Sequence, residues 1–221
     1  GGGDLLHRTT GRQDLWVLKV DLCTNGIDVR TTGAGEKGRT VGSFSNLVGA
    51  VAAVNGDFFN GSFNTDGPAM HAGNGWGGGD HGYVAPIAFG SHFVDIPHHA
   101  NQSGPAAGAV EVISGHPTLL DDGNDVGNPG DSLCTNRHPR TAVGISQDHR
   151  TLFLAVVDGR RSGASGMTCP ELSGLMREMG AFDALNLDGG GSSTLVVNGG
   201  LKNRPSDGSM RTVGNHLAIL Q

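Results

Sequence analysis

The sequence predicts an α+β fold, a single domain over residues 1–221 with a mixed, largely antiparallel β-sheet, few helices and long glycine-rich loops. Three observations lead to this prediction. Predicted strands outnumber helices, one segment alone has a convincing helical pattern, and 39 of the 221 residues are glycine without a Gly-X-Y period. A chain of this length can bury a substantial core as one domain, and no internal repeat or linker-like stretch divides it.

The first elements are expected to be strands. Residues 15–22 alternate between polar and apolar positions, which is typical of a strand. The dipeptide Asn25-Gly26 then indicates a turn, so we expect a hairpin into residues 27–31. A short helix over residues 43–50 and a small apolar run over residues 51–55 follow.

A second pair of strands is predicted more strongly. Residues 141–145 and 151–157 are apolar runs joined by the short turn Gln147-Asp148-His149, so they should be antiparallel neighbours. The middle of the chain, residues 61–131, is rich in loops. Further strands are expected at 84–89, 110–114, 118–120, 184–187, 194–197 and 216–220.

The convincing helix begins at a capping box. Thr168 can accept a hydrogen bond from the third helical amide while Glu171 reaches back, and Pro170 lies in the first turn, where proline costs least. Apolar residues at helical spacing continue to Met179, and Gly180 is positioned to end the helix.

Charge and hydropathy exclude several classes of function. The formal net charge is −6 and the 15 Lys and Arg residues form no basic stripe, which disfavours a nucleic-acid partner. No apolar run approaches the roughly 18 residues that span a bilayer. The chain opens without a leader segment, so we expect a signal peptide to be absent or removed, and we expect an extracytoplasmic location, secreted or periplasmic. The sequence does not define the oligomeric state.

The three cysteines are isolated and lack the spacing of a zinc site. We expect one disulfide and one buried thiol, and we pair Cys134 with Cys169 because both flank segments expected near the site. A disulfide would indicate an oxidising compartment. Cys23 is then the remaining thiol.

The main candidate for chemistry is the segment from Asn186 to Thr194, which follows a predicted strand and contains Asp188 and three successive glycines. A carboxylate at a strand end is held rigidly, and glycines let the backbone approach a ligand and point amides at an anion. The alternative is a glycine-rich turn in which Asp188 only caps the following segment.

Two more charged residues should lie close together. Arg140 enters the strand at 141–145 and Asp158 leaves the strand at 151–157, so antiparallel pairing brings them to one edge. An arginine there could bind a phosphate, and an aspartate could transfer protons. A structural ion pair is the alternative.

These motifs, in this order, resemble the phosphodiester glycosidase family over roughly Asn55 to Leu220. The resemblance is carried by Pro139-Arg140-Thr141-Ala142-Val143-Gly144, Asp158-Gly159-Arg160, Gly166-Met167-Thr168, Asn186-Leu187-Asp188-Gly189-Gly190-Gly191-Ser192-Ser193 and Arg211-Thr212-Val213-Gly214-Asn215-His216. Asn55-Gly56-Asp57-Phe58-Phe59 is similar to the family's Asn-x-Gly-Phe-Phe element, with Asp57 in place of the usual glycine.

The resemblance implies a hydrolase that cleaves the glycosidic bond of a sugar-1-phosphodiester and releases the sugar and a phosphomonoester. A phosphomonoester leaves readily, so positive charge on the phosphate should matter more than strong acid assistance. Asp188 would act as base or nucleophile and Asp158 as its acid/base partner. The implied substrate-binding residues are Arg140, Asn55, Asp57, Phe58, Arg160, Gly189, Gly190, Gly191, Ser192, Ser193, Arg211 and Asn215, with Phe58 stacking on the sugar and Asn55 and Asn215 bonding its hydroxyls.

Two other functions fit the residues. The loop-rich middle contains His71, His81, His92, His98 and His99, which together with Asp57 or Asp80 could hold a divalent cation, calcium or a similar ion, in a metal-dependent hydrolase. No HExxH or HxH pattern supports such a site, and our prediction includes no metal ligand. The third hypothesis is a non-catalytic module that binds carbohydrate or phosphate.

Overall fold

A computed structural model describes residues 3–78, 84–98, 104–127, 130 and 132–221. Its strands form three sheets, and all pairs between described strands are antiparallel. The predicted α+β class and largely antiparallel pairing are confirmed. None of the helices within the described ranges is long and apolar enough to cross a membrane.

The largest sheet has seven strands in the order β1-β2-β13-β12-β14-β10-β11. Its strands are β1 (Gly3–Thr10), β2 (Gln13–Asp21), β10 (Thr118–Asp121), β11 (Asn124–Asp125), β12 (Arg140–Ile145), β13 (Thr151–Val157) and β14 (Asp183–Asn186). The predicted neighbours β12 and β13 pair along their whole length, with Arg140 opposite Val157.

Two five-stranded sheets complete the fold. The first has the order β16-β15-β4-β17-β3, with β3 (Asp28–Thr31), β4 (Ala52–Asn55), β15 (Leu195–Val197), β16 (Gly200–Leu201) and β17 (His216–Leu220). The second has the order β6-β5-β9-β7-β8, with β5 (Pro68–His71), β6 (Asn74–Gly77), β7 (Ala85–Gly90), β8 (Phe93–Asp95) and β9 (Glu111–Gly115).

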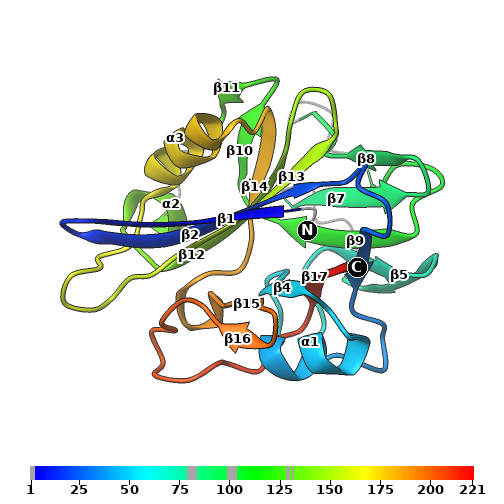
Figure 1. Cartoon of the computed structure of the whole chain (residues 1–221), viewed down its shortest axis with the longest axis horizontal. Helices are drawn as coiled ribbons and strands as arrows, with labels where there is room; N and C mark the ends of the chain where they lie inside the picture. The colour runs from blue at the N-terminus through cyan, green and yellow to red at the C-terminus, as the bar shows by residue number, and fades with distance from the viewer. Residues whose placement is uncertain (1–2, 79–83, 99–103, 128–129, 131) are drawn as a thin grey trace.

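The helices lie on opposite sides of these sheets (Figure 1). They are α1 (Val41–Val48), α2 (Ser132–Thr135), α3 (Cys169–Met179) and the 3-10 turn η2 (Gly190–Ser192). The capping box predicted for α3 is present, and Gly180 ends the helix with a φ of 108°. In α1, Thr40 caps the N-terminus and Gly49 the C-terminus.

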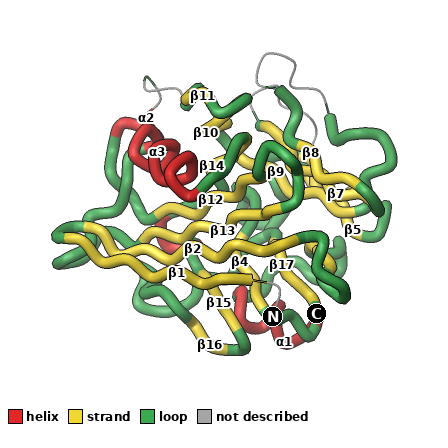
Figure 2. Tube along the Cα trace, turned by 45° about the horizontal axis from the view of Figure 1, so that its top comes forward, coloured by secondary structure: helices red, strands yellow, loops and turns green. Residues whose placement is uncertain are grey.

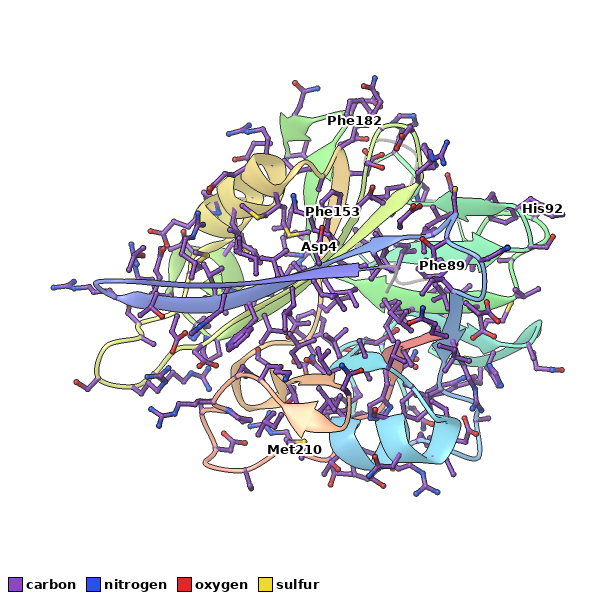
Figure 3. The ribbon with its side chains drawn as sticks, in the orientation of Figure 1. Asp4, Phe89, His92, Phe153, Phe182 and Met210 are labelled. Carbon is purple, nitrogen blue, oxygen red and sulfur yellow. A yellow bond between two sulfur atoms is a disulfide. The ribbon has the colours of Figure 1, made fainter. Side chains whose placement is uncertain are left out.

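The core has three parts. The main cluster fills the space between the seven-stranded sheet and the other two sheets, and includes Leu154, Ile87 and Leu217. A second cluster lies under α3, where Phe153 packs, and a third lies between α1 and its sheet, beside Met210 (Figure 3). Both β12 and β13 are buried on both faces, and their sequences are therefore nearly continuous apolar runs.

The predicted hairpin from residues 15–22 into 27–31 is wrong. The strand β2 pairs with β1 and β13, so both of its edges are occupied, whereas β3 pairs with β17 in a different sheet. The strand β1 was not predicted because its side chains are exposed on both faces and show no alternation. It extends with β2 as a hairpin away from the body of the molecule (Figure 2).

The disulfide prediction is confirmed, since Cys134 of α2 is bonded to Cys169 of α3. Cys23 is free, but it is exposed rather than buried. It lies in the loop after β2, where the chain passes over the surface from one sheet to another.

Candidate active site

The predicted glycine-rich segment passes from the end of β14 in the seven-stranded sheet to β15 in the neighbouring sheet (Figure 1). Backbone hydrogen bonds fix it on both sides. The amide of Asp188 donates to the carbonyl of Gly56 at 3.0 Å, and the amide of Gly190 donates to the carbonyl of Pro139 at 2.9 Å. The segment is therefore a turn held between the end of β4 and the start of β12.

The side chain of Asn55 holds this turn in place through hydrogen bonds in the protein interior. This side chain is completely buried, donates to the carbonyl of Asp188 at 2.6 Å, and accepts from the Thr141 hydroxyl at 2.8 Å and the Thr194 amide at 3.1 Å. Asn55 was expected to bond a sugar hydroxyl. These three bonds instead make it a residue that positions Asp188.

Asp188 is the partly buried carboxylate at the centre of the turn. Burial raises its pKa to about 6, although hydrogen bonds from the Ser192 hydroxyl and the Gly189 amide and the charge of Arg211 act in the opposite direction. A carboxylate with this pKa changes protonation close to neutral pH, which suits a group that accepts a proton in catalysis.

Asp57 lies beside Asp188 but is enclosed. Its carboxylate accepts from the Ser114 amide at 2.8 Å and from the Asn215 side chain at 2.9 Å, and 1% of the residue is exposed. Burial raises the pKa of Asp57 well above its usual range, and the charge of Asp188 adds to this effect. Asn215 in turn accepts from the amides of Thr32 and His216, so neither residue reaches a ligand directly.

Two guanidinium groups flank the glycine turn from the outside. A Cβ atom on Gly190 would lie 3.0 Å from Nη1 of Arg160, so this arginine rests on the turn. Arg160 is exposed and donates to Nδ1 of His138 at 3.1 Å. Burial, together with the charges of Arg140 and Arg160, lowers the pKa of His138, which keeps the imidazole neutral and able to accept this bond.

The second guanidinium belongs to Arg211, which is 41% exposed. It donates to the Ser192 hydroxyl at 3.4 Å and forms an ion pair with Asp207 at 2.6 Å. Ser192 itself bonds the carboxylate of Asp188. Arg160 and Arg211 thus place two exposed positive charges on the turn that contains Asp188.

Arg140 does not face this turn. Its guanidinium is 1% exposed and donates to the backbone carbonyls of Met167 at 2.9 Å, Leu133 at 2.6 Å and Asn136 at 3.0 Å. These bonds tie α2 and the loop before α3 to β12. We therefore assign Arg140 a structural role and do not include it among the phosphate ligands.

Asp158 is likewise occupied. It is 1% exposed and accepts from the Asn203 side chain, from the amide of Arg204 and from the guanidinium of Arg161, each at 3.0 Å. The carboxylate anchors the loop after β16 and forms the structural ion pair that was the alternative at this edge, with Arg161 in place of Arg140. We do not carry Asp158 forward as an acid/base group.

The remaining predicted residues are Gly189 and Ser193 in the turn and Phe58 after β4. Gly189 donates its amide to Asp188, and Ser193 is buried beneath the turn with a hydroxyl that has no hydrogen-bond partner among the described residues. Phe58 is partly buried after β4, and its carbonyl accepts from the Asp66 amide. Sequence reasoning missed Asp207 and assigned no role to His138, which precedes Arg140 in the same cluster; the spacing of Asp207 four residues before Arg211 was a signal for an ion pair.

A cavity of about 480 Å³ lies elsewhere, lined by residues that include Cys23, His92 and His149. It contains none of the predicted site residues. We place the candidate site at Asp188 because a partly buried carboxylate with a raised pKa and two exposed guanidinium groups lie together there, whereas none of the motifs that carry the family resemblance lines the cavity.

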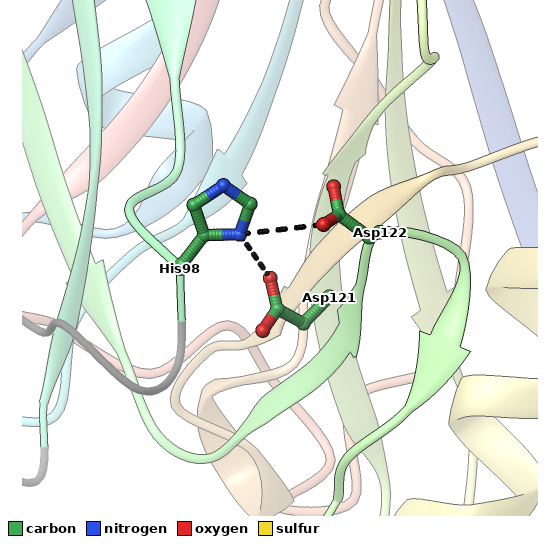
Figure 4. Close-up of side chains that lie close together, drawn as sticks. All are labelled: His98, Asp121 and Asp122. Atoms are coloured by element: carbon green, nitrogen blue, oxygen red, sulfur yellow. Dashed lines mark hydrogen bonds and ion pairs between the residues drawn. The ribbon is translucent and has the colours of Figure 1, made fainter.

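The described histidines of the loop-rich middle, His71, His92 and His98, do not form one metal-binding group. His71 bonds Glu111 at 2.9 Å, and His92 lines the cavity. His98, Asp121 and Asp122 offer three ligand atoms within 4.8 Å of one another (Figure 4). His81, His99 and Asp80 lie outside the described residues.

The group of His98, Asp121 and Asp122 adjoins the opposite end of β14 from the glycine turn. The amide of Asp122 donates at 2.8 Å to Asp183, the first residue of β14, whereas Asp188 lies two residues beyond Asn186, the last residue of that strand. Five residues of extended chain span about 16 Å. A cation held there would lie too far from Asp188 to contact its carboxylate.

The fold is an α+β fold of antiparallel sheets, and the candidate site is a partly buried carboxylate on a glycine turn that two exposed arginines contact. The phosphodiester glycosidase family matches residues 48–220. The chain belongs to this family of glycosidase hydrolases, which confirms the resemblance seen in the sequence.

Individual relatives match shorter stretches. The chain is 42% identical over 83 residues to the SPbeta prophage-derived uncharacterized protein YomE of Bacillus subtilis, covering 38% of this chain and 13% of that protein. It is 41% identical over 68 residues to the N-acetylglucosamine-1-phosphodiester alpha-N-acetylglucosaminidase of Mus musculus, covering 31% of this chain and 13% of that enzyme. The matched stretch is thus about an eighth of each relative.

The fold has a counterpart among solved structures. The zebrafish N-acetylglucosamine-1-phosphodiester alpha-N-acetylglucosaminidase catalytic domain, auto-inhibited by its pro-peptide, superposes with a TM-score of 0.77 at 21% identity. The superposition covers 99% of this chain and 83% of that one, so the similarity in fold extends beyond the residues that the family matches.

Proposed function

We propose that residues 1–221 form one catalytic domain that hydrolyses the glycosidic bond of a sugar-1-phosphodiester, releasing the sugar and a phosphomonoester. The observation that carries this proposal is the position of Asp188. A partly buried carboxylate with a pKa of about 6 lies on a turn that the exposed guanidinium groups of Arg160 and Arg211 contact. A negative substrate group and a reactive carboxylate can therefore be held side by side.

In the proposed reaction, Arg160, Arg211 and the Ser192 hydroxyl bind the phosphodiester. The bond between the anomeric carbon and the phosphate oxygen breaks, and its electrons pass to the phosphate, where the two guanidinium groups stabilise the growing charge. Water attacks the anomeric carbon and gives its proton to Asp188. The phosphomonoester is a good leaving group, so no buried acid is required, in keeping with the enclosed positions of Asp57 and Asp158.

Phe58 remains our candidate for a surface on which the sugar ring stacks. Asn55, Asp57 and Asn215 are proposed to act through their hydrogen bonds, by positioning Asp188 and the end of β4. The disulfide between Cys134 and Cys169 supports an extracytoplasmic location, because disulfides persist in oxidising compartments.

The direct test is a set of glycosyl-1-phosphodiesters incubated with the protein and followed by proton NMR of the released sugar. We expect release of the sugar from at least one diester, loss of that release in Asp188→Asn, and much slower cleavage of a matched aryl glycoside that lacks phosphate. Inversion at the anomeric carbon is expected if Asp188 activates water, whereas retention would assign it a covalent role. Binding of the diesters without product would instead indicate a non-catalytic module, and loss of release after dialysis against chelator would favour a metal-dependent hydrolase.

A further inference from the structure

The loop between β16 and β17 places a carboxylate on the anion site. Asp207 Oδ2 accepts from Arg211 Nε at 2.9 Å and from Arg211 Nη2 at 2.6 Å. Asp207 is 40% exposed, and both of these bonds stay within the one loop instead of joining separate elements of the fold. Its partner is one of the two arginines that we assign to the substrate's phosphate.

Gly191 shows how closely this ion pair rests on the turn. A Cβ atom on Gly191 would overlap both the carboxylate of Asp207 and the guanidinium of Arg211. Gly191 is not among the glycines with positive φ, unlike Gly190 at 61°, so its backbone conformation alone would allow a side chain. A side chain at 191 would therefore displace Asp207 and Arg211, because the space beside Gly191 is filled by this negative and this positive group.

A phosphate bound by Arg211 over Gly191 would lie within a few ångströms of Asp207. The number of charges on that phosphate then decides how strongly it is repelled. A phosphodiester has one negative charge, whereas a phosphomonoester gains a second as its pKa near 6 is passed. Because Asp207 is 40% exposed, the effective dielectric constant between the two charges is closer to that of water than to the value of about 20 for a protein surface, and repulsion across about 5 Å should weaken binding by roughly five- to tenfold for each charge.

We propose that Asp207 is a specificity-determining residue that selects against the doubly charged phosphomonoester. It favours the singly charged substrate over a sugar-1-phosphate and accelerates release of the phosphomonoester product. This inference rests on the proposed function, because it assumes that Arg211 binds the substrate's phosphate.

The test compares methyl phosphate with dimethyl phosphate, because one becomes doubly charged and the other does not. Dissociation constants are measured by NMR titration at pH 8 and pH 5 for the wild-type protein and Asp207→Asn. The quantity compared is the dissociation constant for methyl phosphate divided by that for dimethyl phosphate. At pH 8 we expect this ratio to be about five- to tenfold lower in Asp207→Asn than in the wild type. At pH 5, where both probes have one charge, this relative gain should disappear.

Glu178→Gln is the matched control. Glu178 pairs with Arg8 on the surface at 2.6 Å, so the substitution removes one exposed carboxylate from an arginine pair outside the proposed site. The relative affinities of the two probes should not change in this variant. Thermal unfolding of both variants checks that the fold is retained.

The outcomes separate this inference from the proposed function. Asp207→Asn could bind both probes more tightly by the same factor at both pH values, or leave the ratio of their dissociation constants unchanged. Either result would overturn the role of Asp207, whereas diester hydrolysis by the wild type would still stand. If the wild-type protein neither binds these anions nor hydrolyses any diester, the proposed function fails and the inference fails with it.

Discussion

Replacing the proposed reactive carboxylate should stabilise the protein. Asp188 is ionised in the folded protein only above about pH 6, because burial raises its pKa from 3.8, whereas in the unfolded chain it ionises near its ordinary value. Between these two values the unfolded chain loses its proton first, so the fold loses stability as the pH rises through this window. Above pH 7 the full penalty is present, and below about pH 4 it is absent.

The size of the penalty follows from the shift. Moving the pKa from 3.8 to about 6 corresponds to about 3 kcal/mol in the free energy of unfolding at pH 7.5. An asparagine in place of Asp188 would be neutral at every pH and could still accept the bonds from Ser192 and Gly189. We therefore expect Asp188→Asn to be more stable than the wild type by about 1–3 kcal/mol at pH 7.5 and within about 0.5 kcal/mol of it at pH 4.

Urea unfolding with the disulfide intact measures this difference at pH 4, 5, 6 and 7.5. Asp4→Asn is the control, because Asp4 is an exposed side chain on the edge strand β1 (Figure 3). It should show no comparable gain in stability as the pH rises. A gain in Asp188→Asn that is the same at pH 4 and pH 7.5, or a loss at pH 7.5, would refute the argument that burial of a charge at this turn weakens the fold.

Three further outcomes are expected. The kcat/KM for a cleaved diester should rise with pH to a plateau, with an apparent pKa of about 6, because Asp188 must be ionised; an activity that is flat from pH 4 to pH 8 would contradict this. Arg140→Lys should lower the stability by about 2 kcal/mol, measured by thermal unfolding, with the KM for the diester unchanged; a raised KM at unchanged stability would return Arg140 to the phosphate site. Removing the bond between Cys134 and Cys169 with the double serine variant should cost about 3–4 kcal/mol in urea unfolding, because the bond closes a loop of 35 residues; equal stability would exclude that constraint.

The parts of the fold that the sequence predicts are those with a local cause. The capping box of α3 requires only Thr168 and Glu171, and the pairing of β12 with β13 requires only a short turn between two apolar runs. The hairpin after Asn25-Gly26 was predicted on the same kind of local signal. It failed because β3 finds its partner, β17, at the far end of the chain.

The sequence predicts where the site residues lie better than it predicts which way their side chains point. Asp188 and the glycine turn lie where the strand end predicts, and Arg140 lies opposite Val157, so that Arg140 and Asp158 are at the same end of the paired strands β12 and β13. Sequence spacing does not say which way their side chains point or which backbone groups they bond. Arg140 is directed at three carbonyl oxygens and Asp158 at the loop of Asn203, so both are satisfied within the protein.

The arginines that do flank the turn come from segments whose contact depends on the whole fold. Arg160 follows β13, whereas Arg211 precedes β17, and a glycine at 190 or 191 leaves room for each of them. Such a meeting of distant loops has no signature in either loop alone.

The position of β2 inside the seven-stranded sheet limits where the protein can be truncated. The family matches residues 48–220, yet β2 lies between β1 and β13 inside the seven-stranded sheet, and β3 closes the sheet that contains β4 and β17. A fragment that starts at residue 48 would uncover the long edge of β13 and one edge of β17, together with apolar surface from the main core. Expression trials that follow the family boundary should therefore give an aggregating product, even though every residue of the proposed site is retained.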